Sequence, residues 1–204
     1  MKGLTEKEAE DLLEKEKFNV VKRAVARNKS DFNKISRQIE FPWVMKAASS
    51  KIVHKAKVGG VVLNIKNISS AENAFDKLKR IKGFEKVMIQ ERVHGEELIV
   101  GIKRTPEFSH VLMFGKGGTN VQKENDVSFR ALPVSVDDVK EMMAETKVFS
   151  LLKKKKVKIA VVEQNLMKMS RLAEKYPSLL ELDINPLIVN NKNAVVVDAR
   201  ILFG

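Results

Sequence analysis

The sequence contains no cysteine among its 204 residues. This absence excludes a disulfide framework, a zinc site built on thiolates, an iron–sulfur cluster and a cysteine nucleophile. A chain of this length buries enough surface to fold without covalent cross-links. Because disulfides belong to oxidising compartments, their absence favours a reducing one, and we expect a cytoplasmic protein.

Aromatic residues and long apolar runs are also scarce. Aromatic residues make up 6% of the chain, with one Trp and one Tyr, which argues against a surface that stacks the bases of single-stranded nucleic acid. No apolar run approaches the roughly 18 residues of a membrane-spanning helix. The first residues, MKGLTEK, do not have the pattern of a secretory leader. We therefore expect a soluble protein with no membrane partner.

Positive charge is what the sequence has in excess. Lys and Arg number 38 against 26 Asp and Glu, which gives a formal charge of +12. Such an excess is compatible with a nucleic-acid surface, a site for a polyphosphate ligand, an acidic protein partner or a lysine-rich solvated surface. Composition alone does not choose between these four explanations.

The order of the predicted elements indicates an α/β (α+β) protein. Capping signals and apolar residues at helical spacing predict helices at about 5–16, 30–40, 70–80, 135–147 and 159–175. Apolar runs bounded by turn residues predict strands between them. Three of these strands, at 86–92, 97–103 and 110–114, are expected to form one antiparallel meander. The turn at 190–193 (NNKN) predicts a hairpin near the end of the chain.

Polar residues interrupt this last pair of strands. Alternation along residues 181–187 (ELDINPL) places Glu181, Asp183 and Asn185 on one face of a strand, and a hairpin brings Asp198 alongside. Carboxylate and amide oxygens are ligands that suit Mg²⁺, which needs few protein ligands when phosphates supply the others. The pattern therefore predicts a metal site, although the same residues also suit a plain strand end before Pro186.

A basic, glycine-bearing loop spans residues 49–60 and begins three residues after Lys46. The adjacent Gly59 and Gly60 allow backbone amides to approach an anion closely, and Lys55 adds positive charge nearby. The spacing fits neither a Walker A motif nor a dinucleotide fingerprint. His54 is one of only three histidines, and it is either an ordinary surface residue or a participant in phosphate chemistry.

Three further features have both a functional and a structural interpretation. Arg130, which follows the glycine-bearing segment 115–118, is either a bidentate phosphate clamp or a surface arginine. Glu91 and Glu97 either hold a ribose or an adenine amino group or are solvated strand residues. The lysine run at 153–156 favours a solvated helix end or loop over a nucleic-acid contact.

In this order the motifs resemble the ATP-grasp β subunit of the ADP-forming acyl-CoA (acetate–CoA) synthetases, which are related to succinyl-CoA synthetase. The resemblance runs from about residue 5 to residue 201. Its most specific segments are residues 52–61 (IVHKAKVGGV), 97–104 (ELIVGIKR), 111–115 (VLMFG), 126–130 (DVSFR) and 181–187 (ELDINPL) with 198–200 (DAR). Each segment is weak by itself, but their common order makes the signal specific.

The resemblance implies an ATP-grasp fold with a small α/β lobe at residues 18–84. The larger lobe, with an antiparallel sheet, would comprise residues 1–17 and 85–204. The implied activity is that of an acid–CoA ligase (ADP-forming), which converts acyl-CoA, ADP and phosphate into acid, CoA and ATP. ATP or ADP is the nucleotide substrate, and Mg²⁺ is the cofactor. The implied partner is a separate CoA-binding α subunit, in an α2β2 assembly, with a phosphohistidine that carries the phosphoryl group between subunits.

The resemblance also assigns roles to single residues. It implies that His54 relays the phosphoryl group, that Lys46 contacts the α- and β-phosphates, that Glu91 lies at the adenine and that Glu97 faces the nucleotide. Phosphoryl transfer depends on positioning and on cations around the transferring group. The candidate site residues are His54 and Arg130 for catalysis, Lys46, Lys55, Gly59, Gly60, Glu91 and Glu97 for nucleotide binding, and Asp183, Asn185 and Asp198 for the metal.

The sequence departs from the family pattern at a few positions. Lys57 stands where the family usually has an acidic residue, Lys116 where it has an apolar one, and Gln122 where it has Glu. The lysine run at 153–156 replaces a Gly-Tyr-Arg-Gly-like segment. These departures support an alternative hypothesis, a catalytically degenerate nucleotide-binding subunit with a regulatory or scaffolding role. A nucleic-acid-binding module is supported only by the charge of +12, and we do not favour it.

Overall fold

The computed structural model of the chain describes residues 1–49, 52, 58–118 and 125–204. These residues form two compact units, a larger one of Met1–Val20 with His94–Gly204 and a smaller one of Val21–Val93. In the part of the chain that the structure describes, no helix has the length and apolar character needed to cross a membrane.

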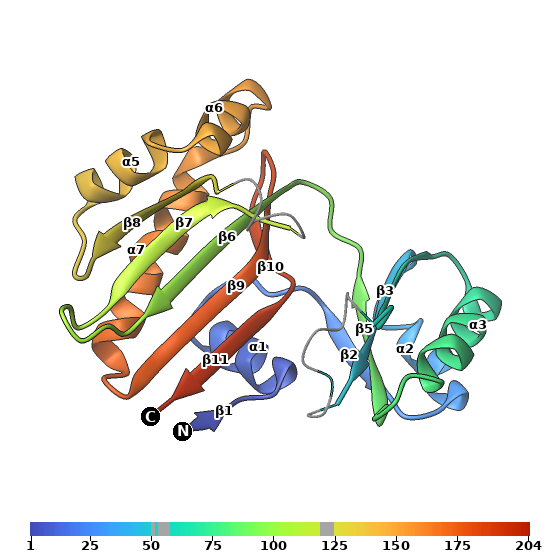
Figure 1. The fold of residues 1–204 in the computed structure, drawn as a ribbon. Helices are drawn as coiled ribbons and strands as arrows, with labels where there is room; N and C mark the ends of the chain where they lie inside the picture. The colour runs from blue at the N-terminus through green and yellow to red at the C-terminus, as the bar shows by residue number, and fades with distance from the viewer. Residues whose placement is uncertain (50–51, 53–57, 119–124) are drawn as a thin grey trace. The chain divides into compact units, whose positions relative to one another are not determined.

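The larger unit is built on a seven-stranded antiparallel sheet (Figure 1). Its strand order is β1-β11-β9-β6-β7-β8, and β10 is a further partner of β9. The long strand β9 therefore pairs with β11 along its first half and with β10 along its second half. The strands are β1 (Lys2–Gly3), β6 (Glu96–Lys103), β7 (Val111–Lys116), β8 (Val127–Ala131), β9 (Leu179–Val189), β10 (Ala194–Val196) and β11 (Ala199–Phe203).

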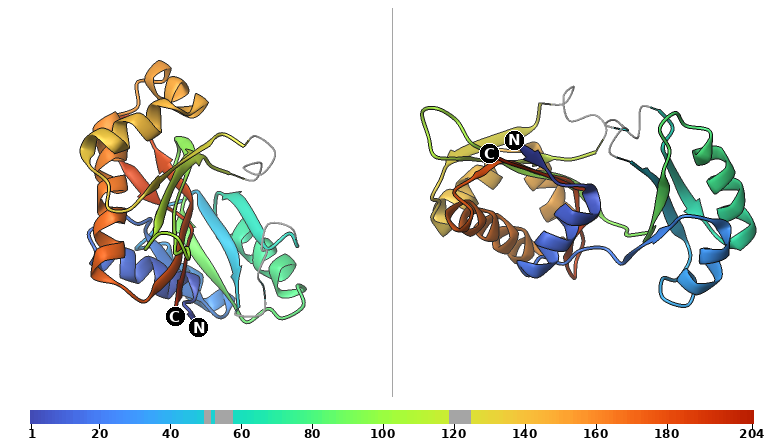
Figure 2. Two further views of the ribbon diagram at one scale, coloured as in Figure 1. Left: turned by 60° about the vertical axis from the view of Figure 1, so that its left-hand side comes forward. Right: turned by 90° about the horizontal axis from the view of Figure 1, so that it is seen from below.

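Helices cover one face of this sheet, as both views of Figure 2 show. The helices are α1 (Glu6–Lys15), α5 (Val136–Ala144), α6 (Lys147–Lys154) and α7 (Ile159–Lys175). Strand residues of the helix-covered face, such as Leu98, Val100 and Ile102, are buried in one core with apolar residues of α1, α5 and α7. Because side chains alternate along a strand, the intervening residues lie on the opposite, open face.

The smaller unit is a four-stranded antiparallel sheet in the order β2-β5-β3-β4. Its elements are β2 (Arg23–Ala26), a 3₁₀ turn at Lys29–Asp31, α2 (Phe32–Ile35), β3 (Trp43–Ala48), β4 (Val61–Ile65), α3 (Ile68–Lys79) and β5 (Lys86–Glu91). Helices α2 and α3 cover one face, where Phe32, Trp43 and Phe75 form a buried aromatic group with edge-on ring contacts.

Local sequence signals account for several helix starts. The predicted capping box at Thr5 and Glu8 is present, and Ser135 with Asp138 forms another. The start of α3 was misplaced by the prediction, because Asn67 is the N-cap and Ser70 completes the box from inside the helix. The helix predicted at 30–40 is wrong in extent, since only a short turn and α2 form there.

The predicted meander is also wrong. Strands β6 and β7 pair with each other in the larger sheet, but β5 pairs with β2 and β3 in the smaller one. The compact units accordingly divide after Val20 and Val93, rather than at the expected 17/18 and 84/85. The segment His94–Gly95 thus connects two units where local turn signals suggested a hairpin.

Candidate functional site

A row of neighbouring residues crosses the open face of the larger sheet. The strand registers place Arg200 opposite Asp183, Asp183 opposite Gly101, Gly101 opposite Met113 and Met113 opposite Phe129. Phe129, at one end of the row, is 53% exposed. A Cβ at Gly101 would lie 3.3 Å from Cε of Met113 and from a backbone carbonyl oxygen of β9, and 3.7 Å from Oδ1 of Asp183, so these groups approach the glycine backbone closely. The row therefore brings the half-buried carboxylate of Asp183 next to the backbone of Gly101.

Asp183 is the electrostatically unusual member of this row. Its Oδ1 is shielded from solvent and has no hydrogen-bond partner among the described residues. Burial, followed by the negative charges of Glu181 and Asp198, raises the pKa of Asp183 to about 6 despite the opposing effect of Arg200. A buried carboxylate oxygen without a donor is costly, and a cation is one group that would offset this cost.

Asn185 lies at a β-bulge beside Asp183. Leu98 pairs with Leu187 and Val100 with Ile184, so that Asn185 and Pro186 together oppose one residue of β6. The predicted alternation therefore holds from Glu181 to Asp183 but is interrupted at Asn185. Bulges of this kind redirect a side chain, and they are frequent next to active sites.

The bulge brings Asn185 to two other segments of the larger unit. Its backbone N–H donates to the carbonyl of Asp198 at 3.2 Å, in the connection between β10 and β11. Its side-chain Oδ1 accepts a hydrogen bond of 2.9 Å from the backbone N–H of Gly118. Gly118 has a φ of +96°, and a Cβ at this position would overlap Oε2 of Glu97. Glu97, Gly118, Asn185 and Asp198 are thus brought together.

The oxygen ligands available near Asp183 suit a magnesium ion better than a metal ion whose ligands all come from the protein. Among the described residues, no group of three or more His, Cys, Asp and Glu is arranged to hold a metal ion. The carboxylates of Asp183 and Asp198 with the amide oxygen of Asn185 would supply a small set of hard ligands. Mg²⁺ commonly uses one or two carboxylates and takes its remaining ligands from water and phosphates.

In the smaller unit, Lys46 lies on the sheet face opposite the helices. It occurs on β3, between Met88 of β5 and Val61 of β4, and its residue exposure is only 6%. Trp43 and Met45 of the same strand are in the helix-covered core, so alternation places Lys46 on the other face. A nearly buried ammonium group at this position is suited to contact an anionic ligand.

Backbone groups make hydrogen bonds with the other nucleotide-binding candidates of the smaller unit, Glu91 and the Gly59–Gly60 pair. Glu91 ends β5, and its Oε1 accepts a hydrogen bond from the backbone N–H of Lys22 at 3.3 Å. The carbonyl of Gly60 accepts from the N–H of Ala47 at 2.8 Å, and Gly59 has a φ of +68° with no atom within 4 Å of a Cβ. Backbone at Gly59 is therefore accessible to a ligand.

The remaining predicted residues of the basic loop lie outside the described residues. They are the proposed relay His54, the cation Lys55 and the family departure Lys57. Gln122, a family departure elsewhere in the chain, also lies outside the described residues.

Arg130, predicted as a phosphate clamp, pairs with a carboxylate of the larger unit. Arg130 pairs with Leu112, a core residue, and lies on the helix-covered side of β8. There its Nη2 donates to Oε1 of Glu145 at 2.6 Å and its Nη1 to Oε2 at 3.0 Å, and Ser128 also donates to this carboxylate. The pKa of Glu145 falls to about 2, mainly because Arg130 donates hydrogen bonds to it.

Two features of the site were missed by the sequence reasoning. An isolated glycine within a predicted strand, here Gly101, is a known sign of close backbone approach, and it was available in the sequence. The backbone donor at Gly118 had no comparable signal, because its partner Asn185 is 67 residues away.

Comparison with known proteins agrees with these features. Residues 1–203 match the family described as ATP-grasp domain. An ADP-forming acetate–CoA ligase of Archaeoglobus fulgidus is 39% identical over 98% of this chain, and the β subunit of a Pyrococcus furiosus acetate–CoA ligase is 36% identical over 98%. This chain spans 30% of the Archaeoglobus protein and 91% of the Pyrococcus subunit.

A solved structure has the same fold throughout. The acetyl-coenzyme A synthetase 1 of Ca. Korarchaeum cryptofilum superimposes with a TM-score of 0.92 at 32% identity, over 100% of this chain and 94% of that one. The predicted ATP-grasp fold is thereby confirmed. On the family match and these relatives, the chain belongs to the ATP-grasp domain family of the ADP-forming acetate–CoA ligases.

Proposed function

We propose that this chain is the nucleotide-binding β subunit of an ADP-forming acyl-CoA synthetase that acts with a separate CoA-binding α subunit. The complex would convert acyl-CoA, ADP and phosphate into acid, CoA and ATP. The observation that carries the proposal is the buried Oδ1 of Asp183, which has no hydrogen-bond partner among the described residues and lies beside Asn185 and Asp198, in a chain of the ATP-grasp domain family. We also propose an α2β2 assembly and a cytoplasmic location.

The metal site of this proposal consists of Asp183, Asn185 and Asp198. When bound, Mg²⁺ would neutralise charge on the phosphate oxygens of the nucleotide. Before binding, burial raises the pKa of Asp183, and repulsion from the charges of Glu181 and Asp198 adds to this effect. The N–H of Gly118 holds Oδ1 of Asn185 and thereby fixes which way the amide points.

The nucleotide contacts are assigned to both units separately. In the smaller unit, Lys46 would bind the α- and β-phosphates, the amides near Gly59 and Gly60 would approach the phosphates, and Glu91 would hold the adenine. In the larger unit, Glu97 would face the nucleotide. Lys55 would add positive charge. Arg130 is left out of this set because its guanidinium is bonded to Glu145.

His54 would be the phosphoryl relay. Structures of the Korarchaeum synthetase contain a phosphohistidine segment, which in one of them points towards the nucleotide-binding site. We propose that a phosphohistidine of the α subunit transfers its phosphoryl group to His54, so that one P–N bond breaks as another forms. The phosphoryl group then passes from His54 to the terminal oxygen of ADP, which yields ATP and a free imidazole.

The test uses the complex with an α subunit of this family. Acyl-CoA consumption that depends on ADP and phosphate is expected for the complex and not for either subunit alone. His54→Ala should abolish turnover, whereas His94→Ala, at an exposed position, should not. Full activity of the His54→Ala complex would remove the relay role.

A degenerate subunit is the second candidate, and the departures at Lys57, Lys116 and Gln122 favour it. It predicts nucleotide binding without phosphoryl transfer. Supplying a radiolabelled phosphorylated α subunit separates the two, because label on His54 is expected only for the catalytic subunit.

A further inference from the structure

The excess positive charge of the chain is concentrated in one unit. Residues 21–93 contain 17 Lys and Arg against 6 Asp and Glu, a formal charge of +11. The rest of the chain contains 21 against 20, a charge of +1. Within the smaller unit, residues 22–37 hold six basic side chains and one acidic one. A charge so localised favours an acidic partner for this segment.

The segment includes a strand with a free edge. In the sheet order β2-β5-β3-β4, β2 has a strand neighbour on one side only. The N–H of Glu91 donates to the carbonyl of Lys22, which makes Lys22 and Glu91 a hydrogen-bonded pair. By the alternation of an antiparallel ladder, Ala24 also directs its backbone towards β5, whereas Val25 directs its N–H and C=O outwards.

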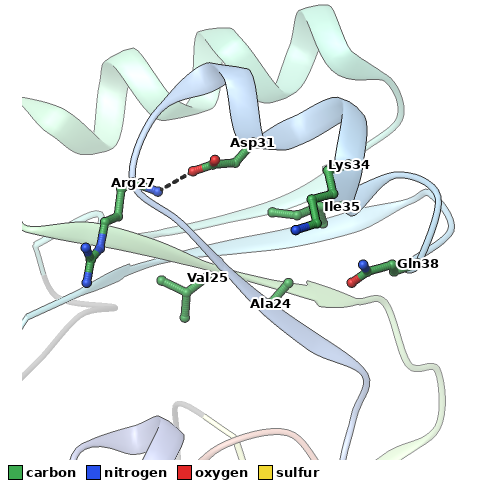
Figure 3. Close-up of a pocket in the computed structure, with 7 residues that line it drawn as sticks. All are labelled: Ala24, Val25, Arg27, Asp31, Lys34, Ile35 and Gln38. Atoms are coloured by element: carbon green, nitrogen blue, oxygen red, sulfur yellow. Dashed lines mark hydrogen bonds between the residues drawn. The ribbon is translucent and has the colours of Figure 1, made fainter.

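A hollow of about 410 Å³ lies along this edge (Figure 3). Ala24 and Val25, successive residues of β2 that point to opposite faces of the sheet, both line it, so the hollow follows the strand edge. Ile35 of α2 adds an apolar wall. The floor is thus an apolar strand edge, which suits an extended chain with apolar side chains at alternate positions.

The rim of the hollow is polar and positively charged. Arg27, Lys34 and Gln38 are exposed, and their side-chain polar atoms have no partner within the described ranges. Asp31 also lines the hollow, but its Oδ2 already accepts hydrogen bonds from the backbone N–H groups of Arg27 and Asn28, at 2.9 and 3.3 Å. Two cations and an amide are therefore available to a ligand.

We propose that the edge of β2 binds an extended acidic segment of a partner protein as an added strand. The backbone of Val25 pairs with the segment, the apolar floor receives its alternate side chains, and Arg27 and Lys34 bind its carboxylates. This inference is independent of the proposed function, because none of the seven lining residues is a nucleotide or metal candidate. Pairing of β2 with a second copy of this chain is disfavoured, because two units of charge +11 repel each other.

The probe for this proposal is a fluorescent peptide of about eight residues that alternates Glu and Val. It is titrated into the full chain with ATP and Mg²⁺ present, so that binding at the nucleotide site does not contribute. The double variant R27E/K34E should weaken binding at least tenfold. The matched double variant K79E/K82E, which changes two exposed lysines of the same unit, should weaken it less than threefold.

Hydrogen exchange provides a second measurement that needs no variant. Binding of the peptide as a strand should slow exchange at the amide of Val25, which points outwards from β2, while amides of α3 keep their rates. Equal losses for the two double variants, or no change at Val25, would overturn the proposal. Stronger competition by tripolyphosphate or by single-stranded RNA than by unlabelled peptide would also overturn it, in favour of an anion site or a nucleic-acid surface.

Discussion

The backbone N–H of Gly118 donates a hydrogen bond of 2.9 Å to Oδ1 of Asn185. This bond links the glycine-bearing segment after β7 to the β-bulge of β9. An amide oxygen has two lone pairs, so Asn185 can accept this bond and still bind a cation. The bond therefore couples the position of the glycine segment to the proposed magnesium site.

Gly118→Ala should weaken the binding of ATP with Mg²⁺ and destabilise the fold. The backbone φ of +96° is unfavourable for alanine, at a cost of about 1–3 kcal/mol, and the new Cβ would displace the carboxylate of Glu97. Gly83→Ala is the matched control, because Gly83 also has a positive φ, +84°, and has no proposed role. Calorimetric titration and chemical unfolding check both variants. A loss of affinity that is equal in the two would contradict the coupling.

The ion pair between Arg130 and Glu145 should make stability depend on pH. The pKa of Glu145 is lowered from 4.5 to about 2 by the hydrogen bonds from Arg130 and Ser128. A lowered pKa stabilises the fold above pH 4.5, and this contribution is lost as the pH falls from 4.5 to about 2. Unfolding of Glu145→Gln should therefore depend less on pH in this window than unfolding of the wild type.

Arg130→Ala tests the interpretation drawn from the sequence. We expect it to lower stability at pH 7 and to change ATP affinity by less than roughly twofold, since surface changes away from a site usually have small effects. A large fall in ATP affinity with unchanged stability would instead support the phosphate clamp that the sequence suggested.

The difference over Arg130 shows where sequence reasoning reached its limit. Because side chains alternate along β8, the sequence places Arg130 and Phe129 on opposite faces of the sheet. It does not reveal which face the helices cover, because that face is set by α5, which comes later in the chain. The bulge at Asn185 had no local signal for the same reason, because it depends on the register of β9 with β6. Both features are decided by contacts between distant segments.

Features encoded within a few residues were predictable. The capping boxes at Thr5 and Ser135 follow from side chains three residues apart, and the hairpin at 190–193 follows from its asparagines. The segment 181–187 was correctly placed on a strand. Strand β5 was assigned to the wrong sheet because His94–Gly95 has local turn chemistry, whereas its pairing with β2 and β3 involves residues at least 38 positions earlier.

Asp183→Asn should stabilise the fold in the absence of metal and weaken the binding of Mg²⁺. Without metal at pH 8, the variant should unfold at a higher temperature, because it removes a buried carboxylate whose raised pKa corresponds to a cost of up to about 3 kcal/mol. This advantage should shrink as the pH falls from about 6 towards 4, where the wild-type carboxyl is protonated. With ATP and Mg²⁺ the order should reverse, because only the wild type keeps the carboxylate ligand. Thermal unfolding with and without Mg²⁺ measures both effects, and equal stabilisation of both proteins would reject Asp183 as a ligand.

Lys46→Met should separate nucleotide binding from folding in the smaller unit. Methionine keeps most of the apolar stem of a residue that is 6% exposed, so the packing of the sheet around β3 should be maintained. The lost charged hydrogen bond to phosphate should weaken ATP binding about 10- to 100-fold, since such bonds contribute about 1.5–3 kcal/mol. Lys66→Met is the matched control, because Lys66 follows β4 and is exposed.

Titration with AMP adds a further check: if Lys46 contacts the α- and β-phosphates, its replacement should weaken ADP and ATP binding more than AMP binding. Equal losses for all three nucleotides would place Lys46 away from the β-phosphate.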